Sequence, residues 1–511
     1  MSRKLLSFSA SLAALPALLT SACSENRLPE GFAFGTAVAG FQVDMGCPTL
    51  PASECEDPRS DWFQFATSTV TVSNPNNHLS GQPLADGPGF YELYQADLDR
   101  MQSLGLTHLR LSIEWSRIFP ESTRGVEGQV ALRERASPSG LAYYRRLLAA
   151  MKARGIRPLV TLHHYTLPAW IHDAVGCNQN LRRCTRRGWL EPDLPAELAK
   201  YAGFVAAELG GEIDQWVTEN EPLAVVVPGF IQPTAARTNP PARAFALDEA
   251  KVAALAMVRA HALMVDAIRA NDQVDADGDG RATDVGLVFN VTPFRPKDPG
   301  DGLDLRAAKN VTTLFNWIFL DAVILGQHDP DFDGTGELDP ALVGRIDFLG
   351  VNYYTVGVLQ GSTDSVLAAF SPLATFNPLT LEQGAVVPEG FLEALDLVRE
   401  RYPELRLIIS ENGADSVTYP EMDRFVAEHF QYLRRAIDRG AKVEGYYFWS
   451  LLDNYEWNHG MSQKFGLYAV DPRDPQKLRT PRASAEAYRQ IVAGRGDAEE
   501  LYRRFPIPEG P

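Results

Sequence analysis

The chain has 511 residues, of which 45% are hydrophobic and 22% charged, with a formal net charge of −17 and an isoelectric point near 5.1. This composition is typical of a globular protein and argues against nucleic acid or an anionic membrane surface as the main partner, since both repel an acidic chain. It is compatible with a small neutral substrate.

The N-terminal residues have the layout of a secretory signal peptide. Arg3 and Lys4 precede an apolar stretch that ends at Leu19, and a basic start followed by an apolar segment directs export. The residues that follow resemble a bacterial lipoprotein cleavage site, which predicts removal of residues 1–22 and a lipid on Cys23; ordinary cleavage at the same bond is the alternative. The sequence therefore predicts an exported protein, either anchored in a bacterial cell envelope by a lipid or secreted. Beyond this segment no apolar run is long enough to span a bilayer.

Eight short β-like segments alternate with helical stretches along residues 23–511. Helical spacing is clear in Leu141, Tyr144, Leu148 and Met151, where steps of three and four place apolar groups on one face. This alternation predicts a single α/β domain folded as a (β/α)8 TIM barrel, in which catalytic side chains follow the C-terminal ends of the strands. The expected strands span residues 32–39, 106–114, 157–163, 213–219, 285–290, 346–352, 405–411 and 443–450.

The cysteines after the N-terminal segment form two close pairs, Cys47 with Cys55 and Cys177 with Cys184. In an exported protein such pairs predict two local disulfides. Unrelated thiols or a shared metal site are the alternatives, but the spacing lacks the Cys-x-x-Cys form and no histidine cluster nearby favours zinc. We expect the disulfides to hold long loops near the mouth of the barrel.

Two glutamates follow predicted strands in distinctive settings. Glu221 lies in the run TENEP at 218–222, and Glu411 lies in the run ISENG at 409–413. Cleavage of a glycosidic bond needs one carboxylic acid to protonate the leaving oxygen and one carboxylate to meet the anomeric carbon. Because both residues stand at the ends of predicted barrel strands, the pair predicts glycoside cleavage at the rim of the barrel.

These two runs resemble the acid/base and nucleophile motifs of glycoside hydrolase family 1, the retaining β-glucosidases and β-galactosidases. Other patterns of the family occur in the same order: FGTA at 34–37, LRLSIEW at 109–115, HHYTLP at 163–168, DFLGVNYY at 347–354 and WSLLDNYEW at 449–457. The resemblance implies that Glu411 attacks the sugar to form a covalent glycosyl-enzyme and that Glu221 acts first as acid and then as base. This chemistry needs no metal or other cofactor.

The resemblance also implies roles for residues around the pair. Arg110 and Tyr354 would hold the nucleophile ionised through hydrogen bonds, and Asn220 would bond the sugar 2-hydroxyl. A structural ion pair for Arg110 and a place in the core for Tyr354 are the alternatives. Tyr354 is also implied to bind the substrate. The remaining substrate-binding residues implied by the resemblance are Gln42, His164, Trp449, Glu456 and Trp457.

Several positions bear on the choice of substrate. Glu456 predicts sugars without phosphate, because its carboxylate would repel a 6-phosphate. Glu221 predicts O-glycosides, since plant thioglucosidases carry glutamine at the acid position. Phe41 and the pair Tyr165-Thr166 differ from the commonest family pattern, which bears on the preferred sugar.

We therefore expect an exo-acting retaining enzyme for small glycosides, with β-glucosides as substrates and β-galactosides or β-fucosides as further ones. Transglycosylation at the same site and a sugar-binding pseudoenzyme are alternatives, although every catalytic residue is present. The sequence does not specify an oligomeric state.

Two acidic loops place carboxylates at the first, third and fifth positions of a turn, as calcium loops do. They contain Asp275, Asp277 and Asp279, and Asp329, Asp331 and Asp333. Oxygen ligands at this spacing suit a structural calcium ion, but neither loop has glutamate at the twelfth position. A pair of solvated acidic turns is the alternative.

Overall fold

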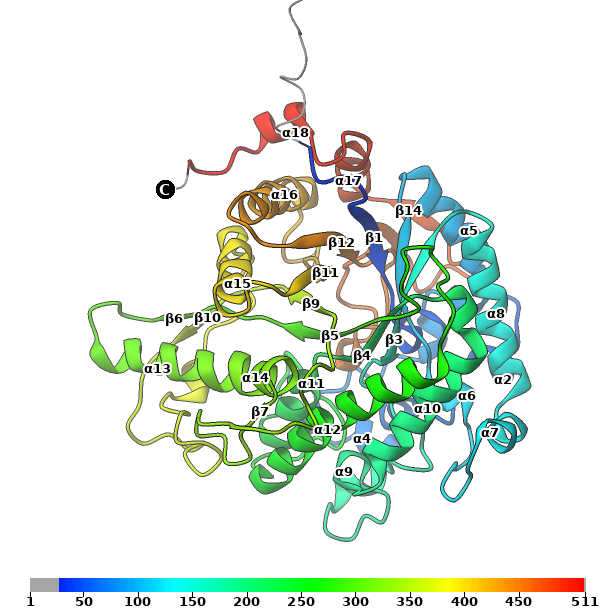
Figure 1. Cartoon of the computed structure of the whole chain (residues 1–511), viewed down its shortest axis with the longest axis horizontal. Coiled ribbons are helices and arrows are strands. Elements are labelled where there is room, and N and C mark those ends of the chain that lie inside the picture. The colour runs from blue at the N-terminus through cyan, green and yellow to red at the C-terminus, as the bar shows by residue number, and fades with distance from the viewer. Residues whose placement is uncertain (1–26, 510–511) are drawn as a thin grey trace, which may run out of the picture.

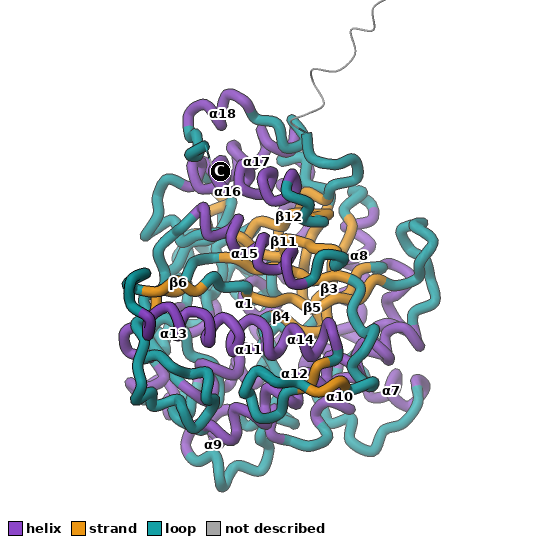
Figure 2. The backbone as a smooth tube through the Cα atoms, turned by 60° about the vertical axis from the view of Figure 1, so that its left-hand side comes forward, coloured by secondary structure: helices purple, strands orange, loops and turns teal. Residues whose placement is uncertain are grey.

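The computed structural model describes residues 27–509, so the predicted signal segment and Cys23 lie outside the described residues. Eight parallel strands form a closed barrel in the order β1-β12-β11-β9-β5-β4-β3-β2. Helices form a layer around the strands (Figure 1, Figure 2). The predicted (β/α)8 barrel is confirmed.

Each predicted barrel strand is present, with small differences at the ends. The first, for example, ends at Ala37 because Gly40 already begins a short helix. The barrel strands are β1 (Ala33–Ala37), β2 (His108–Ser112), β3 (Arg157–His163), β4 (Gln215–Asn220), β5 (Asp284–Asn290), β9 (Phe348–Tyr353), β11 (Arg406–Asn412) and β12 (Val443–Trp449).

A long helix or helix pair follows each barrel strand and packs its apolar face on the barrel. These helices are α5 (Phe90–Ser103), α8 (Pro138–Lys152), α10 (Leu194–Leu209), α12 (Leu247–Asn271), α13 (Gly302–Thr312) with α14 (Ile318–Leu325), α15 (Pro388–Arg401), α16 (Met422–Asp438) and α17 (Ala483–Ala493).

Shorter helices and strands lie in the segments that connect or follow the barrel strands and the long helices. The short helices are α1 (Gly40–Val43), α2 (Ala52–Cys55), α3 (Asp61–Thr67), α4 (Thr69–Val72), α6 (Trp115–Ile118), α7 (Gln129–Arg135), α9 (Ala174–Gln179), α11 (Pro222–Val226) and α18 (Glu499–Arg504). Two-stranded ribbons pair β6 (Phe294–Pro296) with β10 (Gly357–Leu359), β7 (Gln327–His328) with β8 (Glu337–Leu338), and β13 (Tyr468–Val470) with β14 (Arg479–Pro481).

The inside of the barrel is filled by side chains. Leu159, Val217, Val288, Ile408 and Tyr447 belong to one buried cluster contributed by different strands. A filled interior leaves no passage through the barrel, so a substrate can reach only its ends. Polar residues replace this apolar packing at the C-terminal ends of the strands, where the site lies.

Both predicted disulfides are present, between Cys47 and Cys55 and between Cys177 and Cys184, with S–S distances of 2.04 and 1.98 Å. The first lies in the loop between β1 and α5, and the second in the loop between β3 and α10. Loops that follow barrel strands border the active-site face. The disulfides therefore hold loops on that face, as expected.

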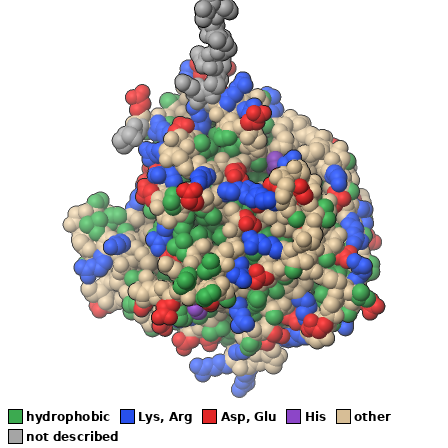
Figure 3. Space-filling view, viewed as in Figure 1, with side chains coloured by type: hydrophobic (Ala, Val, Ile, Leu, Met, Phe, Trp, Pro, Cys, Tyr) green, Lys and Arg blue, Asp and Glu red, His purple; other side chains and the backbone are tan. Residues whose placement is uncertain are grey.

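Within residues 27–509 no helix combines the length and the apolar character needed to cross a bilayer. On the face drawn in Figure 3, Lys and Arg side chains are interspersed with Asp and Glu.

Candidate active site

Glu221 and Glu411 lie at the same rim of the barrel, as predicted. Glu411 is part of β11, and Glu221 directly follows β4 with a positive φ of 45°. Both side chains are buried, each with 4% of the residue exposed. At Gly413 an added Cβ would lie 1.9 Å from the Trp449 carbonyl oxygen. Glycine therefore allows the end of β11 to approach β12 closely and brings Trp449 to the same rim.

Glu411 is held by one cation and one phenol. Arg110 Nη1 donates to Glu411 Oε1 at 2.5 Å, and the Tyr354 hydroxyl donates to Oε2 at 2.5 Å. Arg110 is itself fixed by bonds to Asn220 Oδ1 at 2.7 Å and to the Thr161 hydroxyl at 3.2 Å. Burial raises the pKa of Glu411, while Arg110 and Tyr354 oppose that rise and favour the ionised form.

Glu221 is held by neutral donors. The Asn352 amide donates to Glu221 Oε1 at 2.7 Å, and the Tyr165 hydroxyl donates to Oε2. Burial, followed by the charge of Glu221, raises the pKa of Tyr165 well above its ordinary value, so the phenol remains a donor. The Ser410 hydroxyl donates to Asn352 Oδ1 at 2.7 Å. Asn352 therefore connects the residue before Glu411 with the side chain of Glu221.

A cavity of about 330 Å³ opens beside Glu411. Its walls include the predicted residues Gln42, His164, Tyr354, Trp449, Glu456 and Trp457. The imidazole of His164 is nearly parallel to the rings of Trp449 and Trp457, at centroid distances of 6.1 and 5.9 Å. Such flat apolar faces and polar edges suit a sugar ring.

Asn220 lies beside this wall, next to His164. Its amide nitrogen is 3.4 Å from His164 Nε2, and its oxygen accepts from Arg110. Gln42 donates to Asn454 Oδ1 at 3.1 Å. Among the described residues the buried Gln42 Oε1 has no partner, which leaves it as an acceptor for a ligand hydroxyl.

Glu456 adds a second buried carboxyl to the cavity. Its Oε1 accepts from Trp449 Nε1 at 3.1 Å. Burial raises the pKa of Glu456 to about 7, although the charge of Arg237 partly opposes the rise. This carboxyl can therefore titrate near neutral pH.

Three residues around the carboxyl pair were not among the predicted site residues. Tyr165 departs from the common family pattern, and its bond to Glu221 depends on a positive φ of 71° that the sequence does not reveal. Asn352 ends a predicted buried strand, and a polar amide in that position was a usable signal. Arg237 lies in a loop without a motif, over the Tyr165 ring at 5.6 Å from its centroid.

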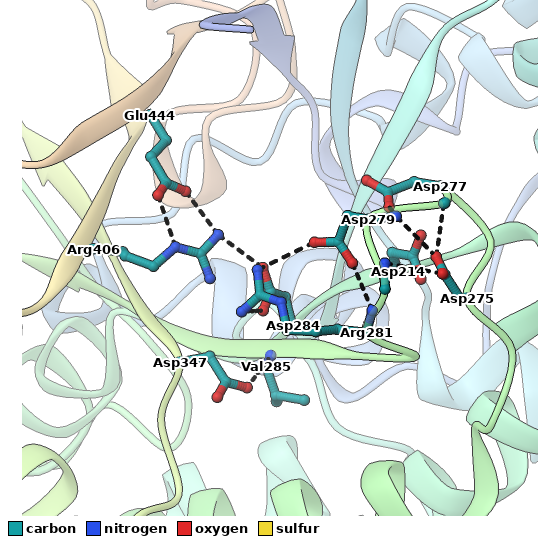
Figure 4. Close-up of polar contacts among 12 residues, drawn as sticks. Asp214, Asp275, Asp277, Asp279, Arg281, Asp284, Val285, Asp347, Arg406 and Glu444 are labelled. Atoms are coloured by element: carbon teal, nitrogen blue, oxygen red, sulfur yellow. Dashed lines mark hydrogen bonds and ion pairs between the residues drawn. The ribbon is translucent and has the colours of Figure 1, made fainter.

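The first acidic loop lies between α12 and the start of β5, and therefore at the N-terminal end of the barrel, opposite the active site. Figure 4 shows its aspartates beside Asp214. Asp275 and Asp277 form a group with Asp214, and their ligand oxygens all lie within 4.8 Å of one another. Burial and the neighbouring Asp277 raise the pKa of Asp214 to about 6. Asp279 instead pairs with Arg281 at 3.2 Å. The three predicted carboxylates therefore do not act together, but two of them gain a partner from the loop before β4.

The second acidic loop lies between β7 and β8. Asp329 accepts from the backbone N–H groups of Asp333 and Gly334 at 3.3 and 2.7 Å, and Asp333 bonds Thr335. In the part of the chain that the structure describes, Asp329, Asp331 and Asp333 do not form a group with metal-binding spacing.

Comparison with known proteins identifies relatives along almost the whole chain. The family model for glycosyl hydrolase family 1 matches residues 24–497. A β-galactosidase of Pyrococcus woesei is 30% identical over 515 residues, which cover 93% of this chain and 98% of that protein. β-Glucosidase 26 of Oryza sativa subsp. japonica is 29% identical over 513 residues, covering 92% of each chain. The crystal structure of Fpglu1 from Fervidobacterium pennivoraus superposes with a TM-score of 0.79 at 28% identity, covering 94% of this chain and 98% of that one.

Proposed function

The chain belongs to glycosyl hydrolase family 1 and is a retaining β-glycosidase, and we propose that it uses Glu411 as nucleophile and Glu221 as acid/base on terminal, non-phosphorylated β-glucosides. The observation that carries these roles is the contrast between the two carboxyls: Glu411 is bonded to the Arg110 cation, whereas Glu221 is bonded to the amide of Asn352 and the hydroxyl of Tyr165.

In the first step, Glu411 attacks the anomeric carbon while Glu221 gives its proton to the departing glycosidic oxygen. Arg110 and Tyr354 direct their donors at the two oxygens of Glu411 and keep it ionised before the attack. The bond from carbon to the leaving oxygen breaks as the ester bond to Glu411 forms. The leaving group departs as a neutral alcohol.

In the second step, Glu221 takes a proton from water, and the resulting oxygen nucleophile displaces Glu411 from the sugar. Two inversions at the same carbon give net retention. Asn220 is positioned by Arg110 and His164 beside the cavity. From there it bonds the sugar 2-hydroxyl, an interaction that strengthens in the oxocarbenium-like transition state.

The glycone is a neutral sugar with free hydroxyls. Glu456 supports this proposal, because its buried carboxyl would face a 6-phosphate across a cavity that also holds Glu411. The relatives carry the names β-galactosidase and β-glucosidase. Glucosides are the first choice, with galactosides and fucosides as further substrates, since pockets discriminate such sugars by only about 1–3 kcal/mol.

We also propose that the protein is exported, with removal of residues 1–22 and a lipid on Cys23 that anchors it in a bacterial envelope. The two disulfides support export, because such bonds persist in oxidising compartments. Mass spectrometry of the mature N-terminus distinguishes a lipid on Cys23 from ordinary cleavage, which would leave an unmodified cysteine.

A structural calcium ion is a further proposal for the loop of Asp275 and Asp277. The close approach of Asp214 supports it, whereas the ion pair of Asp277 with Arg157 at 3.1 Å already neutralises part of the charge. Removal of calcium with a chelator should lower the melting temperature of the wild type but not of Asp275→Asn. Asp331→Asn in the second loop serves as the matched control. Equal melting temperatures of the wild type with and without calcium would exclude a stabilising ion at this loop.

The proposed function is tested by release of nitrophenol from a panel of β-linked nitrophenyl glycosides. The wild type should turn over the glucoside, and Glu411→Gln should not. Glu221→Ala should be slow in water and rescued by azide, with a β-glycosyl azide as product, because azide needs no general base. An α-linked product from Glu221→Ala would contradict the retaining assignment of the pair.

A further inference from the structure

A second cavity, of about 290 Å³, is lined by Glu221. Arg237 lines both this cavity and the sugar cavity, so the two adjoin at its side chain. We call the second one the apolar chamber, because most of its wall is aliphatic or aromatic. The side chains that define it are Phe289, Phe294, Phe315, Leu367, Phe376 and Leu381.

The wall of the apolar chamber comes from segments on one side of the barrel (Figure 1). They are α11 with the π-helical segment η5 (Val227–Ile231), the end of β5, the π-helical segment η6 (Thr313–Trp317) between α13 and α14, and the loop between β10 and α15. Phe294 and Phe315 lie 5.9 Å apart between ring centroids. The chamber is therefore built mainly by the segments that follow β4, β5 and β9 on the rim side, as expected for part of a substrate site.

Several polar side chains in this wall are satisfied within the protein. Thr292 N–H donates to Asn316 Oδ1 at 3.3 Å, and Asn316 Nδ2 donates to the Thr292 carbonyl at 2.8 Å. The Thr292 hydroxyl donates to Asn290 Oδ1 at 3.0 Å. Gln232, Arg237 and Gln383 offer polar partners elsewhere in the wall, but its larger aliphatic and aromatic part offers none. A ligand with many hydroxyl groups would therefore lose hydrogen bonds to water over most of its surface. An apolar ligand has no such penalty.

Resting on the proposed function, we propose that the apolar chamber receives the leaving group of the substrate, and that this group is an apolar alcohol or phenol of about two rings. The acid/base must lie next to the glycosidic oxygen. Because Glu221 lines the chamber, a leaving group attached to a sugar in the adjoining cavity extends into it. A cavity of about 150 Å³ holds one benzene ring, so the chamber, at about 290 Å³, has room for about two.

The β-glucosides of phenol and 4-phenylphenol test this proposal, because the two leaving groups differ by one apolar ring. The wild type should show a kcat/KM on the order of tenfold higher for the larger glucoside, as added apolar contact strengthens binding. Cellobiose, whose leaving group is a sugar, should be a poorer substrate than either. A preference for cellobiose would overturn the proposal.

Two variants of the chamber wall test whether the preference for the larger glucoside arises in the apolar chamber. Val227 is half-buried in the chamber wall, so Val227→Phe fills part of the space and should abolish the preference for the larger glucoside. Leu381→Ala removes wall contact from the other side and should reduce the preference. Val126→Phe is the matched control, because Val126 is also half-buried and lines neither cavity.

The results distinguish a wrong assignment of the apolar chamber from a wrong proposed function. Turnover of both glucosides with no preference, or a preference that survives in both chamber variants, overturns the assignment of the chamber but leaves the retaining β-glucosidase intact. Turnover of neither glucoside by the wild type defeats the proposed function, and this inference with it.

Discussion

Glu456→Gln is expected to make the protein more stable above neutral pH. Folding raises the pKa of Glu456 from 4.5 to about 7, chiefly because the carboxyl is buried. The folded state therefore binds more protons than the unfolded state between these two values, and stability falls as the pH rises through that window. A glutamine does not titrate, so the variant escapes this loss. Its amide oxygen still accepts from Trp449 Nε1.

The magnitude follows from the size of the shift. At about 1.4 kcal/mol for each pKa unit, the full loss in the wild type is on the order of 3 kcal/mol above about pH 7 and disappears below about pH 4.5. An unfolding entropy of about 2 cal/mol/K for each residue gives about 1 kcal/mol/K for 511 residues. The melting temperature of Glu456→Gln should therefore exceed that of the wild type by about 3 °C at pH 8 and match it near pH 4.5.

Differential scanning calorimetry across this pH range provides the measurement, and Glu486→Gln provides the control. Both substitutions remove one negative charge, but Arg489 lowers the pKa of the exposed Glu486 to about 2. A benefit from reduced net charge would appear in both variants, whereas the burial argument predicts a gain only for Glu456→Gln. The same gain at pH 5 and pH 8 would refute the reasoning.

Three further changes probe the site and the loops. Arg110→Met removes the cation that favours ionised Glu411, so kcat/KM should fall about 10- to 100-fold and its acid limb should move to higher pH; an unmoved acid limb would contradict this role. Tyr165→Phe removes a donor from Glu221 and should slow phenyl glucosides several-fold more than activated dinitrophenyl glucosides, whose leaving groups need less protonation; equal slowing would indicate a packing role. Cys177→Ala combined with Cys184→Ala removes a disulfide with a sequence separation of 7. The lost loop-closure entropy is worth about 2.5 kcal/mol, so the melting temperature should fall by about 2–3 °C. An unchanged melting temperature would indicate a loop fixed by its packing alone.

The barrel could be predicted because the alternation of apolar segments and amphipathic helices in the sequence matches the order of strands and helices in the fold. Its strands are short apolar runs between helices of regular spacing, a pattern typical of parallel strands that are covered by helices. The strand ends then place Glu221 and Glu411 on one rim. Family motifs added residues far apart in sequence, including Gln42 and Glu456, which the structure brings to one cavity.

The contacts that distinguish the two glutamates were less accessible to sequence reasoning. The bond from Tyr165 to Glu221 depends on a left-handed backbone conformation, and Arg237 reaches the site from an irregular loop. The apolar chamber gathers side chains from loops with no common motif, so only their packing reveals it. In the first acidic loop, the spacing identified Asp275 and Asp277 but gave no hint of Asp214, which comes from another part of the chain.

The different roles of Glu411 and Glu221 follow from the charge of the groups that are hydrogen-bonded to each carboxyl. A cation bonded to a buried carboxylate stabilises the ionised form, which a nucleophile needs before each turnover. A carboxyl that must carry a proton in one step and lose it in the next is better served by neutral groups, because a bonded cation would oppose protonation. Arg110 reaches Glu411 from β2, whereas Asn352 reaches Glu221 from β9. In the strand order β2 is three places from β11 and only two from β4, so contact across the barrel, not strand adjacency, gives Glu411 the cation and with it the role of nucleophile.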